Sequence, residues 1–187
     1  MILAFDTATS FGAVCAVTPG RRGRAARAGD LLVAVDGLVD DPSAIEGIVV
    51  GRGPGSFTSI RIGLAMARTL ALALDVPVAG ASTLEAFATG TPVLDARRGE
   101  VFATGLLPAE PRVCKPAELD VTGLTLVGDG AIRYRTLFEA NGAAIPPDDD
   151  SAHVPDPLLL VERAGAFGAA ELVEPLYVRD PDAKEQV

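Results

Sequence analysis

Hydrophobic runs separated by turn residues organise the first half of the chain. An apolar run from Ile2 ends at Asp6, and after a polar turn a second run continues to Val17, which predicts a β-hairpin. Further on, a β-branched run leads through glycines into a stretch with apolar residues every three to four positions, the pattern of a helix. The pattern predicts strands and helices, in order, at 2–6, 12–17, 45–50, 58–74, 76–80 and from 83 onward.

Two segments between the hairpin and the next strand are not predicted to be strands. Residues 19–29 carry four arginines among glycines and alanines, which is typical of a solvated loop. Asp30 is placed to cap a short helix that reaches about Asp40, with apolar residues on one face. We therefore expect a loop followed by an isolated short helix.

The second half repeats the opening of the first. After turn residues at 89–92, a strand again ends in an aspartate, Asp95, and a turn leads into an apolar run to Leu107. This echo predicts an α/β protein with two related lobes, 1–91 and 92–187, the second one shortened. Later elements are expected as strand 124–127, helix 131–141, an acidic connector at 146–157, helix 158–171 and strand 176–178.

A glycine-rich loop joins the strand at 45–50 to the long helix. A strand, a glycine turn and a helix form phosphate sites in nucleotide-binding proteins, but such sites need a lysine that this stretch lacks. One interpretation is a sharp turn with a capped helix, and the other is direct anion binding at the helix start. The residues of this glycine loop are Gly51, Gly53, Pro54, Gly55, Ser56 and Thr58.

The long helix is apolar on more than one face. One stripe at helical spacing suits packing on a sheet: Ile60, Leu64, Ala67, Ala71 and Leu74. A second stripe lies on another face, with Gly63 between the two stripes: Ile62, Met66, Thr69 and Ala73. The second face requires a covering surface, which either another lobe or another protein could supply.

Composition narrows the class of protein. With 187 residues, 49% hydrophobic, the chain is long enough for one good core or two small lobes. A net charge of −9 works against holding a phosphate backbone, so we expect nucleic acid to bind only through a partner. Only Cys15 and Cys114 are present, which argues against a disulfide framework and fits a reducing cytoplasmic setting. The longest apolar segment is too short for a membrane span.

Few residues suit catalysis. The single histidine, His153, lies in the acidic connector and is expected at the surface. Neither a catalytic triad nor a His/Cys metal cluster can be assembled, so we expect no metal and no cofactor. Asp6 with Thr7, and Asp95, could form a weak phosphate or magnesium site, as in a phosphotransferase. The alternative is that each aspartate bonds turn N–H groups.

Several stretches in a fixed order resemble the bacterial TsaB family, also called YeaZ. They cover most of the chain, and the glycine loop with its helix is the most specific of them. The stretches are Ile2–Thr9, Gly51–Thr58 with Ile60–Gly63, Gly80–Leu84, Asp95–Phe102 and Pro175–Arg179.

The resemblance implies an actin/Hsp70/sugar-kinase-like fold. It also implies a cytoplasmic, non-catalytic role in making N6-threonylcarbamoyladenosine at position 37 of tRNAs that read codons beginning with A. The family member pairs with TsaD, which carries the metal and transfers the group, and the ATPase TsaE joins them. A homodimer is expected when TsaD is absent. The implied contact residues on two neighbouring helices are Leu31, Val35, Ile62, Gly63, Met66 and Thr69.

Two regions depart from the family pattern. Residues 19–44 are short, without the family's third strand, and the second lobe has no glycine cluster for adenosine. An alternative function is an independent enzyme, either a small-molecule kinase using Asp6 and Asp95 or a protease. Another is a self-associating scaffold whose long helix pairs with its own copy.

Overall fold

The computed structural model describes residues 1–104 and 110–179 and begins with a five-stranded sheet. The sheet has the order β3-β2-β1-β4-β5, in which the first three strands are antiparallel and the last two run parallel to β1. The predicted opening hairpin and the following strands are confirmed. The strands are β1 (Ile2–Asp6), β2 (Ala13–Val17), β3 (Arg21–Ala25), β4 (Gly47–Gly51) and β5 (Val78–Ala81).

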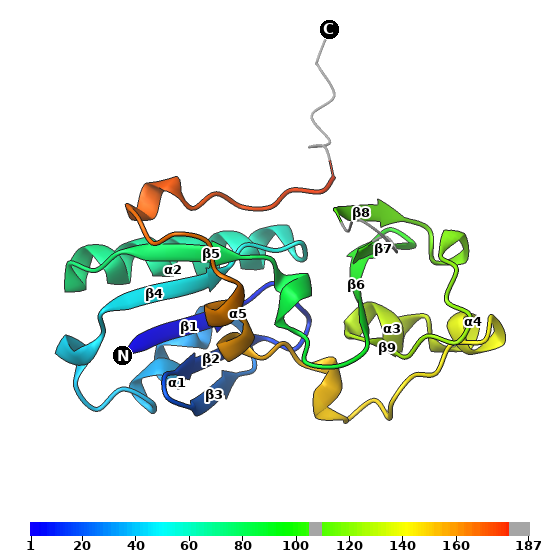
Figure 1. Ribbon diagram of the computed structural model, residues 1–187, viewed down its shortest axis with the longest axis horizontal. Coiled ribbons are helices and arrows are strands. Elements are labelled where there is room, and N and C mark those ends of the chain that lie inside the picture. Colours follow the sequence, from blue (N-terminus) through cyan, green and yellow to red (C-terminus); the bar gives the residue numbers. More distant parts are fainter. Residues whose placement is uncertain (105–109, 180–187) are drawn as a thin grey trace, which may run out of the picture.

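A second sheet repeats this connectivity with one strand fewer. Its order is β8-β7-β6-β9, with β6 antiparallel to β7 and parallel to β9. Figure 1 shows the two sheets side by side, joined at the start of β6. Both therefore open on a hairpin whose first strand adds a parallel neighbour on its other side. The strands are β6 (Thr91–Arg97), β7 (Glu100–Thr104), β8 (Pro111–Cys114) and β9 (Leu126–Val127). The part of the predicted second hairpin beyond Thr104 lies outside the described residues until Glu110.

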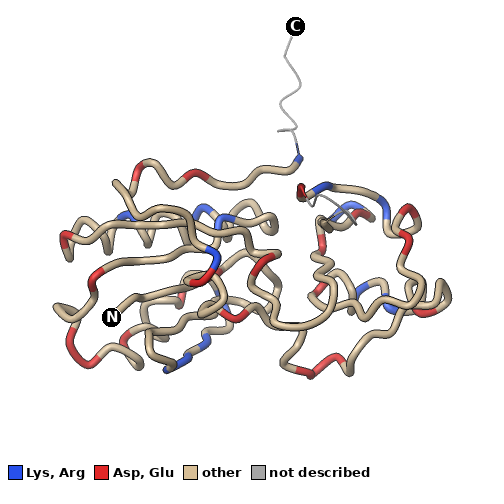
Figure 2. Tube along the Cα trace, in the orientation of Figure 1, with Lys and Arg blue, Asp and Glu red and all other residues tan. Residues whose placement is uncertain are grey.

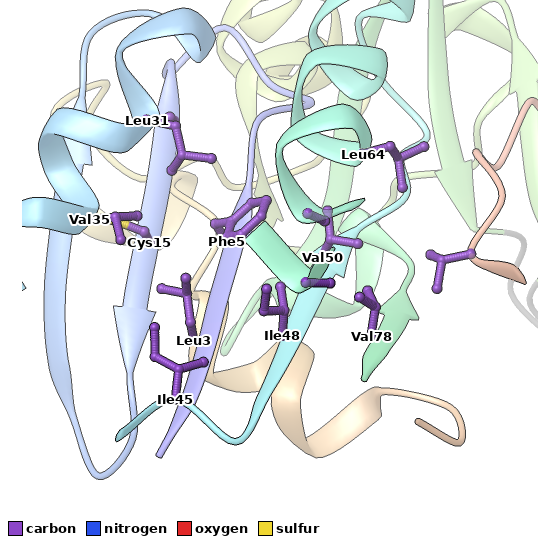
Figure 3. Packing of buried hydrophobic residues seen from close by; sticks show 14 of the residues in the cluster. Leu3, Phe5, Cys15, Leu31, Val35, Ile45, Ile48, Val50, Leu64 and Val78 are labelled. Atoms are coloured by element: carbon purple, nitrogen blue, oxygen red, sulfur yellow. The ribbon is translucent and has the colours of Figure 1, made fainter. Parts of the chain in front are cut away.

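Two helices cover one face of the first sheet. Leu31 and Val35 of α1 (Leu31–Asp36) and Leu64 of α2 (Phe57–Leu74) pack with Phe5 and other strand residues in one core (Figure 3). The stripe from Ile60 to Ala71 is buried, as its helical spacing predicted. Hydrophobic burial at one face thus fixes both helices on the sheet.

The chain's last described part returns to the first lobe. Helix α5 (Pro157–Arg163) covers the other face of the first sheet, where Leu160 packs on Ala4 and Val49. Farther along, Val173 joins the core beneath α2. Figure 1 shows this segment crossing back over the first sheet. Residues 157–173 therefore pack on the first lobe, whereas the predicted division placed them in 92–187.

Several local predictions were wrong. The basic stretch is not a loop, because its residues form β3, an edge strand whose arginines line the lower rim in Figure 2. Consequently the third strand that the family pattern demands is present. The predicted helix at 158–171 ends at Arg163, and residues 176–178 form no strand.

Two further helices cover the second sheet. The single helix expected at 131–141 is two short ones, α3 (Asp129–Arg133) and α4 (Arg135–Ala140), separated at Tyr134. Phe138 and Ala131 bury themselves against Val93 and Leu126 of the strands. Both cysteines are buried and unpaired, one in the core of each lobe.

His153 is buried, which corrects its expected surface position. Its Nδ1 accepts the Gly128 N–H at 3.1 Å, so Nε2 carries the proton and donates to the Pro146 carbonyl at 3.1 Å. The imidazole thereby ties the acidic connector to the turn before α3. Its role is structural because both ring nitrogens are used.

Candidate functional site

Asp6 stands at the carboxyl end of β1, beneath the glycine loop, and is 1% exposed. One carboxylate oxygen accepts the Ala8 N–H at 2.7 Å and the other accepts the Thr83 hydroxyl at 2.6 Å. Burial raises the pKa of the Asp6 carboxyl, against the opposing effect of these hydrogen bonds. A Cβ at Gly51 would lie 1.8 Å from Asp6 Oδ2, so only glycine leaves room for this side chain. Asp6 therefore holds together its own strand, the turn at Ala8 and the segment that begins at Thr83. This agrees with the interpretation in which the aspartate bonds a turn N–H group and does not bind phosphate or magnesium.

The glycines of the loop allow close contacts within the chain. Gly53 has a φ of +93° and exchanges hydrogen bonds with Thr83, donating to its hydroxyl at 3.1 Å and accepting its N–H at 2.8 Å. A Cβ at Gly55 would lie 2.3 Å from the Ala8 carbonyl oxygen, which accepts the Ser56 N–H. Ser56 is the N-cap of α2, Pro54 is buried, and Thr58 is exposed on the first turn. These contacts favour the sharp turn with a capped helix.

Thr7 and Gly63 form a second close contact. The Thr7 hydroxyl donates to the Ser59 carbonyl at 2.7 Å, and a Cβ at Gly63 would lie 2.5 Å from that hydroxyl oxygen. Gly63 is buried against β1's end. The small residue thus permits a contact inside the chain, and its predicted place on a partner surface was wrong.

Asp129 joins the two lobes, and Asp95 lies next to it in the second lobe. Asp129 accepts the Ser10 N–H with one oxygen at 2.8 Å and the Asp95 N–H with the other at 3.0 Å. The Asp95 carboxylate pairs with Arg97 at 3.1 Å and with Arg133 at 3.3 Å. Sequence reasoning gave Asp129 no role, although its place between two glycines after a strand was a usable signal. These two guanidinium groups therefore balance the negative charge of the Asp95 carboxylate.

A small cavity lies between the lobes at this point. Its volume is about 250 Å³, and it is lined by Thr7, Ser59, Asp95, Arg97 and Asp129 among others, but not by Asp6. Pockets that bury small organic ligands measure roughly 300–1,000 Å³. Across the described residues no group of three or more His, Cys, Asp or Glu side chains could hold a metal ion. The structure does not bring Asp6 and Asp95 together at this cavity.

The helices α1 and α2 leave apolar side chains outside. On α1, Leu31 and Val35 lie in the core, so the prediction that they contact a partner was wrong; the exposed residues are Leu32 and Val33. On α2, Ile62 and Met66 are half-buried and Thr69 is exposed. We define the outer face of α2 as Ile62, Ala65, Thr69, Leu72 and Ala73, of which Leu72 is 85% exposed.

Helix α2 is also long and apolar enough, by length and composition alone, to cross a membrane. Its buried stripe packs on the sheet and Ser56 caps its start. We interpret it as the core helix of the first lobe.

The sequence of this chain is similar to a known family model and to several known proteins. A family model described as TsaD, tRNA N6-adenosine threonylcarbamoyltransferase, matches residues 35–107. The chain is 44% identical over 85 residues to the tRNA threonylcarbamoyladenosine biosynthesis protein TsaB of Bacillus subtilis, covering 39% of this chain and 37% of that protein. An uncharacterized protein of Mycobacterium tuberculosis is 36% identical over 149 residues, covering 75% of this chain and 67% of that one. The match thus spans little more than a third of the Bacillus protein.

A solved structure matches over nearly the whole chain. YeaZ from Pseudomonas aeruginosa superposes with a TM-score of 0.73 at 26% identity, covering 94% of this chain and 98% of that one. The glycine loop and α2 fall within the stretch that the TsaD model matches. Given the sequence relatives and the shared fold, this chain belongs to the TsaB family, also named YeaZ.

Proposed function

We propose that this chain is a non-catalytic partner subunit in the formation of N6-threonylcarbamoyladenosine on tRNA. In this proposal it pairs with TsaD in the cytoplasm, TsaE joins the pair, and tRNA is held through the assembly. The names of its relatives support the pathway. We also assign the two-lobed fold to the actin/Hsp70/sugar-kinase class, because the second sheet repeats the order of the first four strands of the first sheet.

One observation carries the pairing: the outer face of α2 is apolar and uncovered by the rest of the described chain. Leu72 is 85% exposed, and Val33 on neighbouring α1 is 76% exposed. Both helices cover the same face of the sheet, so their exposed side chains lie on the same side of the first lobe. Apolar side chains gathered on one surface mark protein contacts more often than scattered ones do.

The proposal that this chain is not catalytic is supported by the surroundings of Asp6 and Asp95. Asp6 is buried among its own hydrogen-bond partners, and Asp95 is paired with two arginines. Neither carboxylate is available to bind a phosphate-bound cation or to act as a base without breaking contacts that hold its own lobe together. These contacts support a reactive centre that lies on the partner and not on this chain.

Reconstitution tests the proposal. We expect purified TsaD and TsaE with ATP, a threonylcarbamoyl donor and a tRNA transcript to form the modified nucleoside only when this chain is added. The isolated chain should hydrolyse no ATP above a blank. Full modification without the chain, or ATP turnover by the chain that Asp6→Asn abolishes, would refute it.

A further inference from the structure

The last described residues, Glu174–Arg179, lie across both lobes, and we define them as the strap. Figure 1 shows this segment running along the first lobe toward the second. Its residues form no helix or strand. Before the strap, the chain passes between the lobes twice, once ahead of β6 and once ahead of α5. The strap is therefore a further connection between the lobes, and it is made by noncovalent contacts.

The first part of the strap is bonded to the first lobe. The Leu176 N–H donates to the Arg52 carbonyl oxygen at 2.8 Å. The Tyr177 ring stacks on Phe57 with ring centroids 5.3 Å apart, and its hydroxyl accepts a hydrogen bond from Arg61 Nε at 2.9 Å. Phe57 and Arg61 both belong to the start of α2. A main-chain hydrogen bond and an aromatic contact thus hold this part against the glycine loop and α2.

The last two residues of the strap contact the second lobe. Val178 is half-buried and packs in an apolar cluster with Phe102 of β7. Arg179 pairs with Glu100 at the start of the same strand. The contacts therefore change from one lobe to the other between two consecutive residues, Tyr177 and Val178. Because these contacts are few and partly exposed, they can break without unfolding either lobe.

A poorly satisfied arginine lies beside the strap. The Nε of Arg52 is buried and has no hydrogen-bond partner, and its Nη1 reaches the Glu174 carbonyl oxygen only at 3.4 Å. A Cβ at Gly80 would lie 2.5 Å from Arg52 and 2.7 Å from Val173, so the arginine side chain is enclosed at this point. A covered N–H group without a partner costs free energy that water recovers when the group is exposed. Arg52 therefore opposes the closed position of the strap.

We propose that the strap is a releasable connection that holds the two lobes in one relative orientation. In the released state, Tyr177 leaves α2, the last two residues leave β7, and water reaches Arg52. The second lobe then turns about the two chain crossings, and the lobe-junction cavity changes shape because it lies between the same lobes. Local release of a few contacts followed by domain rotation is an established type of conformational change.

Two measurements on the full chain test the strap. Nitroxide labels at Glu162→Cys and Thr136→Cys, at exposed positions of α5 and α4, give the distance between the lobes by pulsed electron paramagnetic resonance. Hydrogen exchange of the Leu176 N–H reports release of the strap. The native cysteines are buried, and the chain without introduced cysteines shows whether they take up label.

Val178→Ser with Arg179→Gln removes the contacts with the second lobe. We expect the labelled parent to give a single narrow distance distribution and the variant to give a broader one or a second distance. The Leu176 N–H should exchange about 10-fold faster or more in the variant. Glu100→Gln breaks the ion pair from the side of β7 and should change both measurements in the same direction. Circular dichroism and melting temperature check that each variant is folded.

Matched controls separate the strap from general effects of charge and exposure. Arg27→Gln with Leu172→Ser removes one exposed ion pair and one exposed apolar side chain of the first lobe, and should leave the distances unchanged and Leu176 exchange within about 3-fold of the parent. Arg52→Met removes the buried N–H and should slow Leu176 exchange. The proposal is overturned if the strap variants keep the parent's distance distribution, whether or not Leu176 exchanges faster. Faster exchange in Arg52→Met would overturn the opposing role of this arginine.

Discussion

At the scale of single residues, Asp6 shows how a motif that suggests chemistry can serve structure. The carboxylate is enclosed by the glycine loop and bonded to Ala8 and Thr83. Gly51 gives it space that any Cβ would fill. The sequence placed Asp6 at a strand end correctly, yet two chemical roles stayed open. The hydrogen bond from Thr83, 77 positions away, decides between them, and no local pattern encodes it.

Asp6→Asn should change how stability depends on pH. Burial raises the pKa of the folded Asp6 carboxyl above the ordinary 3.8, so the folded state binds this proton more tightly than the unfolded state. Its contribution to stability is full below 3.8 and is lost as pH rises through the folded pKa, by about 1.4 kcal/mol per pKa unit of difference. Asparagine cannot ionise, so the variant should gain stability relative to wild type over that window.

Urea unfolding at a series of pH values measures this difference in free energy of unfolding. Asp149→Asn, at an exposed carboxylate, should give a curve parallel to wild type. Parallel curves for Asp6→Asn as well would show that Asp6 is ionised equally easily in both states.

At the scale of elements, helices and strands whose apolar residues recur with a clear period could be predicted from the sequence. Elements without such a period could not. Helix α2 was found because its buried residues recur every three to four positions. The strand β3 was missed because its sequence, Arg21 to Ala25, has no apolar alternation; pairing with β2 alone makes it a strand. Likewise α5 covers the first sheet from more than 100 positions away, which local spacing cannot encode.

Leu160→Ala should therefore destabilise the first lobe although it lies near the chain's end. Leu160 is fully buried and packs on Ala4 and Val49 of the first sheet. Removing such a side chain costs about 2–5 kcal/mol. Thermal or urea unfolding gives the loss, and Leu172→Ala, at a 74% exposed site, should change stability by less than about 0.5 kcal/mol. A loss as small as the control's would mean that α5 does not hold this face.

At the scale of the whole molecule, two similar sheets meet at a junction that the Asp129 carboxylate bridges. The echo of two hairpins predicted the paired sheets, but not that residues 157–173 return to the first one. Nor could the sequence separate Leu31 and Val35, which are in the core, from the exposed Leu32 and Val33, because α1 is too short for its apolar positions to define a face. The other described residues leave the outer face of α2 uncovered.

The affinity of this chain for TsaD tests the central claim most directly. Thr69→Glu and Leu72→Glu place a charge on the outer face of α2 at exposed positions, so the fold should not suffer. Each charge would be desolvated in the contact, and we expect calorimetry to show roughly 100-fold weaker binding, about 2.8 kcal/mol. Leu137→Glu, the same change at an exposed leucine of α4, should bind like wild type. Unchanged affinity in both α2 variants, with melting temperatures as in wild type, would contradict the account.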